Sequence, residues 1–468
     1  MKKPNNRIGQ LAALSLATAI AGFTTNSQAE IPGISGTDHS FVACQFNIPT
    51  PDGDSVPMWG YGEGTVAADC ATAQYPGPTL IVNQGETINI TLKNFLPVAT
   101  SMVFPGQNSS VTGGSKGLMT QEVTADGATT AIYTFDASHA GTYMYESGSN
   151  PALQTEMGLF GAIVVRPTGY IAPTYSGLDA NNNPILTNPG NTKAYGHTET
   201  AYDYEYLFLL SEIDPDIHKQ YVQGHFHHVD NTKYHDVLWF INGRNFPNTL
   251  SSASDPSLPH QPYNIVPQTR PGEKLLARMV GASRGAHPFH FHGANVQLIA
   301  QDGRLLESAP GQGPDLGRSD YTLLTSSGQT YDAIFQWTGK NTGWDIYGVE
   351  ADGSTLHDCI DLNNNETGVL GGDGYDDTTW EWCADHGVKV PVHLPSTQDM
   401  GFGGFYSGSQ FFGDLGDLPP GEGGLNPSGA YLYAWHSHNE KELINNDIFP
   451  GGMFTALFVH PYPTFVQR

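Results

Sequence analysis

The strongest constraint on the fold is a pattern of short strand-like segments that occurs twice along the 468-residue chain. Runs rich in β-branched and aromatic residues alternate with turns of Gly, Pro, Asn and Asp, which is typical of antiparallel sheets. The first series comprises 79–82, 87–92, 131–135, 142–145 and 159–165. The second comprises 204–210, 237–242, 274–280, 295–300, 331–336, 431–435 and 454–460.

The two series resemble each other in sequence. The first contains "PGPTLIVNQGETINITLKN", and the second contains the similar "RPGEKLLARMVGA". Likewise "AGTYMYESG" and "EMGLFGAIVVRP" resemble "SGAYLYAWHSH" and "GGMFTALFVHP". An internal repeat of this length indicates a duplicated domain. We therefore predict an all-β fold of two sandwich domains, residues 30–168 and 201–468, joined by a linker at 169–200.

The second series is interrupted by a segment rich in Gly, Asp and Asn at about 340–428. Its stretches "DLNNNETG" and "GGDGYDD" place many side-chain oxygens together, which a calcium ion prefers as ligands. No spacing there matches a known calcium loop, so a solvated surface insertion is favoured over a calcium site.

The N-terminus has the pattern of a secretory signal. Lys2, Lys3 and Arg7 precede an apolar run at 11–23, and small residues follow at 27–29. The run is too short for a membrane anchor, so residues 1–29 are predicted to be a cleaved signal peptide. The remaining chain has no long apolar segment, and we expect an exported protein, periplasmic or extracellular, that does not insert into a membrane.

An oxidising compartment favours disulfides between the four cysteines. Their spacing favours Cys44 with Cys70 and Cys359 with Cys383, although four cysteines allow three pairings.

The net charge of −26 limits the partners. An acidic chain without a Lys/Arg-rich run is repelled by phosphate backbones and anionic lipids. Nucleic acid is therefore excluded as a partner, and metal cations are favoured.

Two histidine pairs carry the clearest chemical signal. His290 and His292 lie in "HPFHFHG", and His436 and His438 lie in "WHSH". Alternate residues of a strand point to one face, so each pair projects from one side of its strand. Four imidazoles suit copper, with zinc also possible. Each pair alone could equally be hydrogen-bonded core histidines; their matching places in a repeat favour a metal.

The combination of "PGPTL", "GETINITLKN", "HPFHFHG" and "WHSH" followed by "GGM" resembles the multicopper oxidases, which are built from repeated cupredoxin domains. The resemblance implies two cupredoxin-like Greek-key β-sandwiches. It implies that His290, His292, His436 and His438 are ligands of a copper cluster that reduces oxygen. It also implies that His287 and Met453 belong to a mononuclear copper site.

The chain departs from the family pattern at decisive positions. Ser437 stands where the family has the copper-binding cysteine, and Glu442 stands where it has a further histidine. The first domain has 103–106 "VFPG" and 143–148 "YMYESG" in place of the family's histidine pairs. A blue-copper site needs a thiolate, so a laccase-type electron relay is not expected.

Other polar groups near these motifs have weaker interpretations. Glu440, Glu442 and Glu146 could bind metal or orient the histidines, but a solvated acidic rim is favoured for them. A second group of histidines could form a copper patch or a polar loop; it comprises His218, His225, His227, His228 and His235.

Three functions are compatible with these observations. The favoured one is an exported copper-binding protein without a blue-copper centre. The alternatives are an atypical copper oxidase of metal ions or phenols, and a metal-free cupredoxin scaffold for surface assembly. Whether the chain is an enzyme stays open, and so does the choice between a monomer and a homotrimer.

Overall fold

The computed structural model describes residues 31–178, 184–224, 229–253, 255–270, 272–337, 408–409 and 431–460. The predicted signal peptide, nearly all of the predicted insertion with its calcium segments, and Cys359 and Cys383 lie outside these residues. In the described part of the chain, no helix has the length and apolar character needed to cross a membrane.

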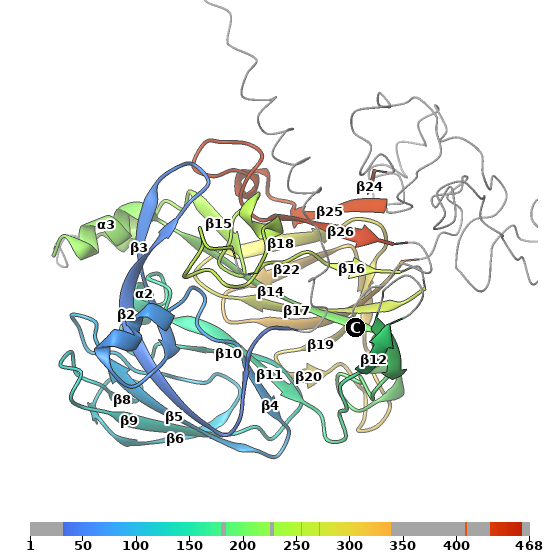
Figure 1. Ribbon diagram of the computed structural model, residues 1–468, viewed down its shortest axis with the longest axis horizontal. Coiled ribbons are helices and arrows are strands. Elements are labelled where there is room, and N and C mark those ends of the chain that lie inside the picture. The colour runs from blue at the N-terminus through green and yellow to red at the C-terminus, as the bar shows by residue number, and fades with distance from the viewer. Residues whose placement is uncertain are drawn as a thin grey trace, which may run out of the picture.

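The first half of the chain forms a sandwich of two sheets (Figure 1). The larger sheet has the order β3 (Ser55–Glu63), β2 (Asp38–Pro49), β5 (Thr87–Asn94), β9 (Ala131–Asp136) and β6 (Asn108–Gly113). The smaller sheet has the order β1 (Ile34–Ser35), β4 (Leu80–Asn83), β11 (Phe160–Arg166) and β10 (Gly141–Glu146). A small hairpin of β7 (Ser115–Lys116) and β8 (Gln121–Glu122) and the short helix α2 (Pro151–Gln154) complete it.

The second half repeats this plan. One sheet has the order β15 (Leu238–Ile241), β14 (Tyr204–Ile213), β17 (Lys274–Gly281), β23 (Thr330–Gln336), β19 (Val296–Gln301) and β20 (Arg304–Leu305), with β21 (Arg318–Asp320) beside β19. The other has the order β16 (Gln268–Thr269), β26 (Phe454–Val459), β25 (Tyr431–Ser437), β18 (Ala286–Phe291) and β22 (Thr322–Ser326), with β24 (Gly408–Ser409) beside β25.

The strand pairings confirm the internal repeat. In the first sandwich β5 pairs with β2 in parallel and with β9 antiparallel; β17 pairs with β14 and β23 in the same way. Strand β11 pairs with β4 in parallel and with β10 antiparallel, and β26 does so with β16 and β25. The predicted all-β, cupredoxin-like sandwich architecture is confirmed.

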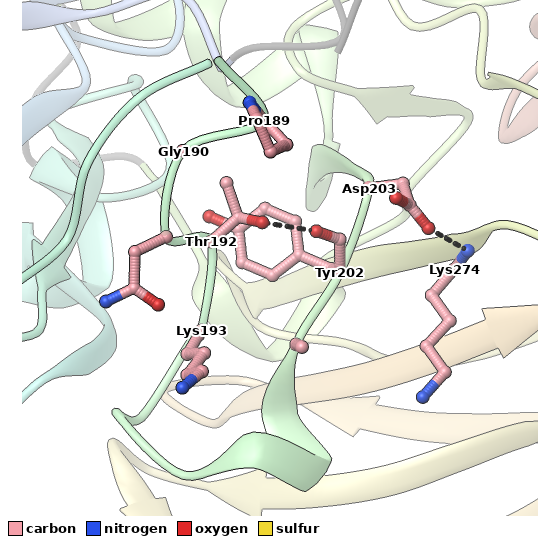
Figure 2. Close-up of a pocket in the computed structure, with 9 residues that line it drawn as sticks. Pro189, Gly190, Thr192, Lys193, Tyr202, Asp203 and Lys274 are labelled. Carbon is pink, nitrogen blue, oxygen red and sulfur yellow. Dashed lines mark hydrogen bonds between the residues drawn. The ribbon is translucent and has the colours of Figure 1, made fainter.

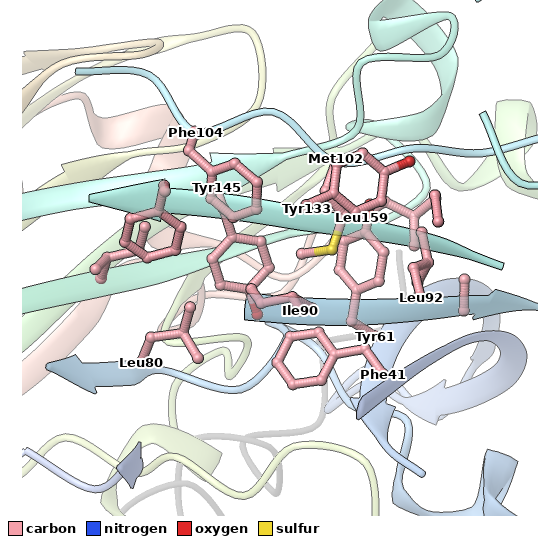
Figure 3. Packing of buried hydrophobic residues seen from close by; sticks show 14 of the residues in the cluster. Phe41, Tyr61, Leu80, Ile90, Leu92, Met102, Phe104, Tyr133, Tyr145 and Leu159 are labelled. Carbon is pink, nitrogen blue, oxygen red and sulfur yellow. The ribbon is translucent and has the colours of Figure 1, made fainter. Parts of the chain in front are cut away.

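Each sandwich has an aromatic-rich core between its sheets, because alternate residues of each strand point inward. Figure 3 shows the first core, in which Phe41 and Ile90 from one sheet meet Leu80 and Tyr145 from the other. The second core is built in the same manner around Phe208, Phe289 and Trp435.

The two sandwiches also share a buried interface. A third apolar cluster joins Val42 and Val164 of the first half to Leu209 and Phe240 of the second. Buried charges reinforce it, since Arg166 on β11 pairs with Glu205 on β14, which also accepts from Arg278 on β17. Burying charges is tolerable only when they are paired in this way.

The segment predicted as a linker contains regular structure. Strands β12 (Thr174–Leu178) and β13 (Pro184–Asn188) form a hairpin, after which Ala194 and Tyr202 pack against Leu276. Helix α3 (Pro215–Val222) follows β14 and lies beside β3 (Figure 1).

The predicted disulfide between Cys44 and Cys70 is confirmed. It ties the middle of β2 to the 3-10 turn at Ala67–Thr72.

Candidate metal centre

Adjacent strands bring the two histidine pairs together. Strands β18 and β25 are antiparallel neighbours, and their register places His290 directly opposite His436. Phe289, Phe291 and Trp435 alternate with them and point into the second core. The apolar alternation thus fixes which face of the sheet the histidines occupy.

The four imidazole rings form one cluster. The ring of His290 has its centroid 4.7 Å from that of His292, 5.6 Å from that of His436 and 4.9 Å from that of His438. The Nε2 atoms of His292 and His436 lie 3.1 Å apart. Two nitrogens that bind one ion at about 2.0 Å each are roughly 3 Å apart. This pair of atoms therefore fits a shared metal ion.

Neighbouring oxygens orient two of the rings. The carbonyl oxygen of Ser437 lies 2.7 Å from Nδ1 of His436 and can only accept a hydrogen bond, so this Nδ1 carries the proton. The Nε2 atom of His436 consequently has a free electron pair and accepts from Nε2 of His292 when no metal is bound. Nδ1 of His290 lies 2.7 Å from the Thr322 hydroxyl on β22.

Burial favours the uncharged form of two rings of the cluster. Burial, followed by the neighbouring imidazoles of His292, His436 and His438, lowers the pKa of His290 to about 3. Burial likewise lowers the pKa of His436. A neutral imidazole is the form that binds metals.

As the side chains stand, no group of three or more His, Cys, Asp or Glu residues in the described part of the chain is placed to hold a metal ion. The cluster offers two nitrogens at chelating distance, and further ligands require a ring to turn. His438 has room for this because its side chain is 54% exposed.

The opposite face of the same two strands carries a different arrangement. His287 is buried, with Nε2 2.9 Å from Glu212 and Nδ1 3.0 Å from Glu442. Burial lowers the pKa of His287, but the hydrogen bonds with Glu212 and Glu442 outweigh it and raise the pKa to about 9. Both ring nitrogens are engaged, so a metal could bind His287 only by displacing a carboxylate.

Each oxygen of the two carboxylates takes part in at least one hydrogen bond. Glu442 accepts from the Ser437 hydroxyl at 2.6 Å and from the Asn439 amide at 2.8 Å. Glu212 accepts from the backbone N–H groups of Arg284 and Gly285. A Cβ at Gly285 would lie 3.0 Å from the His287 ring, so the absence of a side chain there lets the ring approach Glu212.

Met453 lies beside this network but belongs to the apolar core. Its backbone N–H donates to the backbone carbonyl of Glu442, and its own carbonyl accepts from the backbone N–H of Ser437. Its role as an axial copper ligand stays a prediction.

The solvated acidic rim predicted for the three glutamates is wrong for Glu442, which is buried because it bonds His287 and Ser437. The interpretation suits Glu440, whose side chain is 85% exposed. Glu146 lies at the end of β10 in the first sandwich, and its carboxylate accepts a hydrogen bond from the Thr155 hydroxyl.

The second histidine group is only partly described. His218 is buried on α3, where Nδ1 lies 2.7 Å from the Pro57 carbonyl and Nε2 3.5 Å from Glu156. His235 lies in the irregular segment that precedes β15, and its backbone N–H donates to the Asp214 carboxylate. His225, His227 and His228 lie outside the described residues.

Sequence reasoning missed Glu212, which lies 75 positions before His287 and just beyond the predicted strand 204–210. A single acidic residue at the end of an apolar strand, "YEYLFLLSEI", was the available signal.

A separate pocket of about 250 Å³ lies between the segment 189–193 and the start of β17. Figure 2 shows its lining by Lys193, Lys274 and Tyr202, with the Lys274 N–H donating to Asp203. No His or Cys lines it, so it does not resemble a copper site.

Comparison with known proteins finds a similarity to multicopper oxidases in part of the chain. A family model described as multicopper oxidase matches residues 63–169, within the first sandwich. Multicopper oxidase MCE of Talaromyces pinophilus is 28% identical over 153 residues, which cover 32% of this chain and 23% of that protein. Multicopper oxidase CTB12 of Cercospora beticola is 36% identical over 93 residues, covering 19% and 14%. Over residues 63–169 the first sandwich is thus similar to the multicopper oxidases.

The matches span less than a quarter of the length of either relative. Among solved structures, a multicopper oxidase named mgLAC has a TM-score of 0.48 at 14% identity, covering 93% of this chain and 88% of that one. The blue copper oxidase of Nitrosomonas europaea has a TM-score of 0.48 at 14% identity, covering 92% of each chain.

Proposed function

We propose that this chain is a member of the multicopper oxidase superfamily and is an exported copper-binding protein without a blue-copper centre. Copper would be held by His290, His292, His436 and His438. The observation that carries the proposal is the 3.1 Å approach of the His292 and His436 Nε2 atoms on neighbouring strands. Bound copper would supply one-electron redox chemistry at that face.

Neighbouring residues orient two of the histidine rings of this site. The Ser437 carbonyl and the Thr322 hydroxyl fix two rings by their Nδ1 atoms, which leaves Nε2 for a metal. Such outer partners typically account for a 10–100-fold change in metal affinity. The acidic chain attracts cations from a distance, as its net charge of −26 implies.

We infer that the mononuclear electron-accepting copper site is absent, for three reasons. Serine replaces the thiolate, glutamate replaces a histidine, and His287 is bound on both sides by carboxylates. Both ring nitrogens of His287 are hydrogen-bonded to carboxylates, so no metal is needed to hold these side chains together.

A metal-free scaffold is the second candidate. It is favoured by the absence of a ready three-ligand group in the residues that the structure describes.

Copper content after reconstitution separates the two functions. The purified chain is loaded with Cu²⁺, desalted and analysed for metal, alongside the double variant His290→Ala/His292→Ala. His139→Ala is the matched control, because His139 is exposed and outside the cluster. We expect bound copper in the wild type and the control and its loss in the double variant. Equal copper in all three proteins, or none in the wild type, contradicts the proposal.

A further inference from the structure

His292 lies at the point where its strand leaves the sheet. In the register of β18 with β25, the last residue pair is Phe291 with Trp435, so the ladder ends one residue before His292. Gly293 follows with a φ of +103° inside a bend at 292–294, a conformation that favours glycine. The ladder alone therefore does not fix where the His292 ring lies.

A side-chain hydrogen bond holds His292 beyond the end of the ladder. The indole Nε1 of Trp435 donates to the main-chain carbonyl of His292 over 2.9 Å. The carbonyl cannot shift without breaking this bond, and a buried indole N–H that loses its acceptor is costly. Trp435 thus extends the connection between β25 and β18 by one residue.

The indole of Trp435 is itself firmly placed. Its side chain is fully buried, and its ring centroid lies 5.8 Å from that of Phe208, 4.9 Å from that of Phe291 and 5.0 Å from that of Phe335. A ring packed against three others in a dense core has few alternative rotamers. The core of the second sandwich therefore sets the position of the indole N–H.

Two consecutive residues of β25 contact His292 from opposite faces of the strand. Trp435 faces the core, and His436 faces the histidine cluster, because side chains alternate along a strand. Trp435 holds the carbonyl of His292, while Nε2 of His436 lies 3.1 Å from Nε2 of His292. The separation of these two nitrogens therefore depends on where Trp435 holds the His292 backbone.

We propose that Trp435 is a positioning residue for metal binding, whose indole N–H keeps Nε2 of His292 at chelating distance from Nε2 of His436 before a metal binds. The inference rests on the proposed copper-binding function. It adds that copper affinity depends on a residue of the apolar core that is not one of the proposed ligands. Ligands held in place beforehand bind more tightly because less conformational entropy is lost on binding.

Two substitutions remove the N–H at position 435. Trp435→Phe also removes part of the ring, whereas 3-benzothienylalanine in place of Trp435 keeps the bicyclic shape and has sulfur instead of the N–H. Trp239→Phe is the matched control, because Trp239 is fully buried in the same core and its Nε1 donates to Asp236. Thermal unfolding shows which variants are folded, and the benzothienyl variant keeps the test decisive if Trp435→Phe is not.

The first measurement needs no metal. In the metal-free full chain with ¹³C-labelled histidines, we expect a nuclear Overhauser effect between the rings of His292 and His436, whose centroids are 5.0 Å apart. It should be present in the wild type and in Trp239→Phe and lost when position 435 has no N–H. A ring contact that persists in the folded position-435 variants overturns the positioning role.

Copper competition titrations are the second measurement. Affinity should fall about tenfold in the position-435 variants, as is typical when a group that orients a ligand is lost, and should change less than about twofold in Trp239→Phe. Unchanged affinity in the position-435 variants, or an equal loss in Trp239→Phe, contradicts the proposal. If the wild type binds no copper, the proposed function fails, and the ring contact alone then decides whether Trp435 positions His292.

Discussion

At the scale of single residues, one face of β18 and β25 has the histidines that the family resemblance implies. The other face has different residues around His287. The Ser437 hydroxyl donates to Glu442, and Glu442 in turn bonds His287. The family resemblance leads us to expect a cysteine thiolate in place of Ser437 and a histidine imidazole in place of Glu442. The histidine cluster and the carboxylate network therefore occupy opposite faces of the same strands and can be altered separately.

Ser437→Cys tests whether the thiolate alone is missing. We predict no intense absorption near roughly 600 nm after copper loading, because His287 stays bound by Glu212 and Glu442 and no second imidazole is available. The free energy of unfolding should fall by about 1–2 kcal/mol because the hydroxyl bond to Glu442 is lost. Visible spectra of the loaded variant and wild type check this; a strong blue band in the variant would refute it.

His287 should make stability depend on pH. Its pKa in the folded protein is about 9, above the ordinary value of 6.5, so folding favours the protonated ring. The contribution is fully present below pH 6.5 and is lost as pH rises through 9. Relative to His287→Gln, the wild type should lose on the order of 3 kcal/mol of unfolding free energy across that range.

Urea unfolding at several pH values measures this difference. His139→Gln serves as the control, since His139 is exposed and lies outside the network. A His287→Gln difference that does not change between pH 6 and 10 contradicts a charged His287.

At the scale of elements, strand β22 is predicted to support the histidine cluster through Thr322. Thr322→Val removes the oxygen 2.7 Å from Nδ1 of His290, and copper affinity should fall about tenfold. Thr322→Ser retains the hydroxyl and should restore affinity. Competition titration with a copper chelator compares the three proteins; equal affinity for valine and serine would show that Thr322 has no such role.

Much at this scale could be predicted from sequence. The strands with alternating or β-branched patterns, such as β5 and β17, were predicted with nearly the observed bounds. The convergence of the two histidine pairs was also expected, since both lie on strands of one domain. Strands β2 and β3 were missed, because Cys, Gln, Gly and Pro interrupt their patterns. The partnership of His287 with Glu212 depends on long-range pairing that no local pattern encodes.

At the scale of the whole molecule, the interface of the two sandwiches depends on a buried ionic network. Arg166 and Arg278 share Glu205, and Arg278 also reaches Asp332. Glu205→Gln leaves two buried guanidinium groups poorly compensated and should lower the free energy of unfolding by about 3–5 kcal/mol.

Denaturant unfolding checks this prediction against a matched acidic control. Asp320→Asn removes a partner of Arg318 in an exposed pair and should change stability by less than about 1 kcal/mol. If Glu205→Gln were as mild as the control, the ionic network would not stabilise the interface.

The central claim is that copper binds at the histidine face of β18 and β25 and not at the His287 network. Diffraction from a copper-soaked crystal, measured on both sides of the copper absorption edge, tests it directly. The account predicts an anomalous peak within bonding distance of Nε2 of His292 and His436, and none between His287 and Met453. A peak beside His287, or no peak at the histidine cluster, would contradict it.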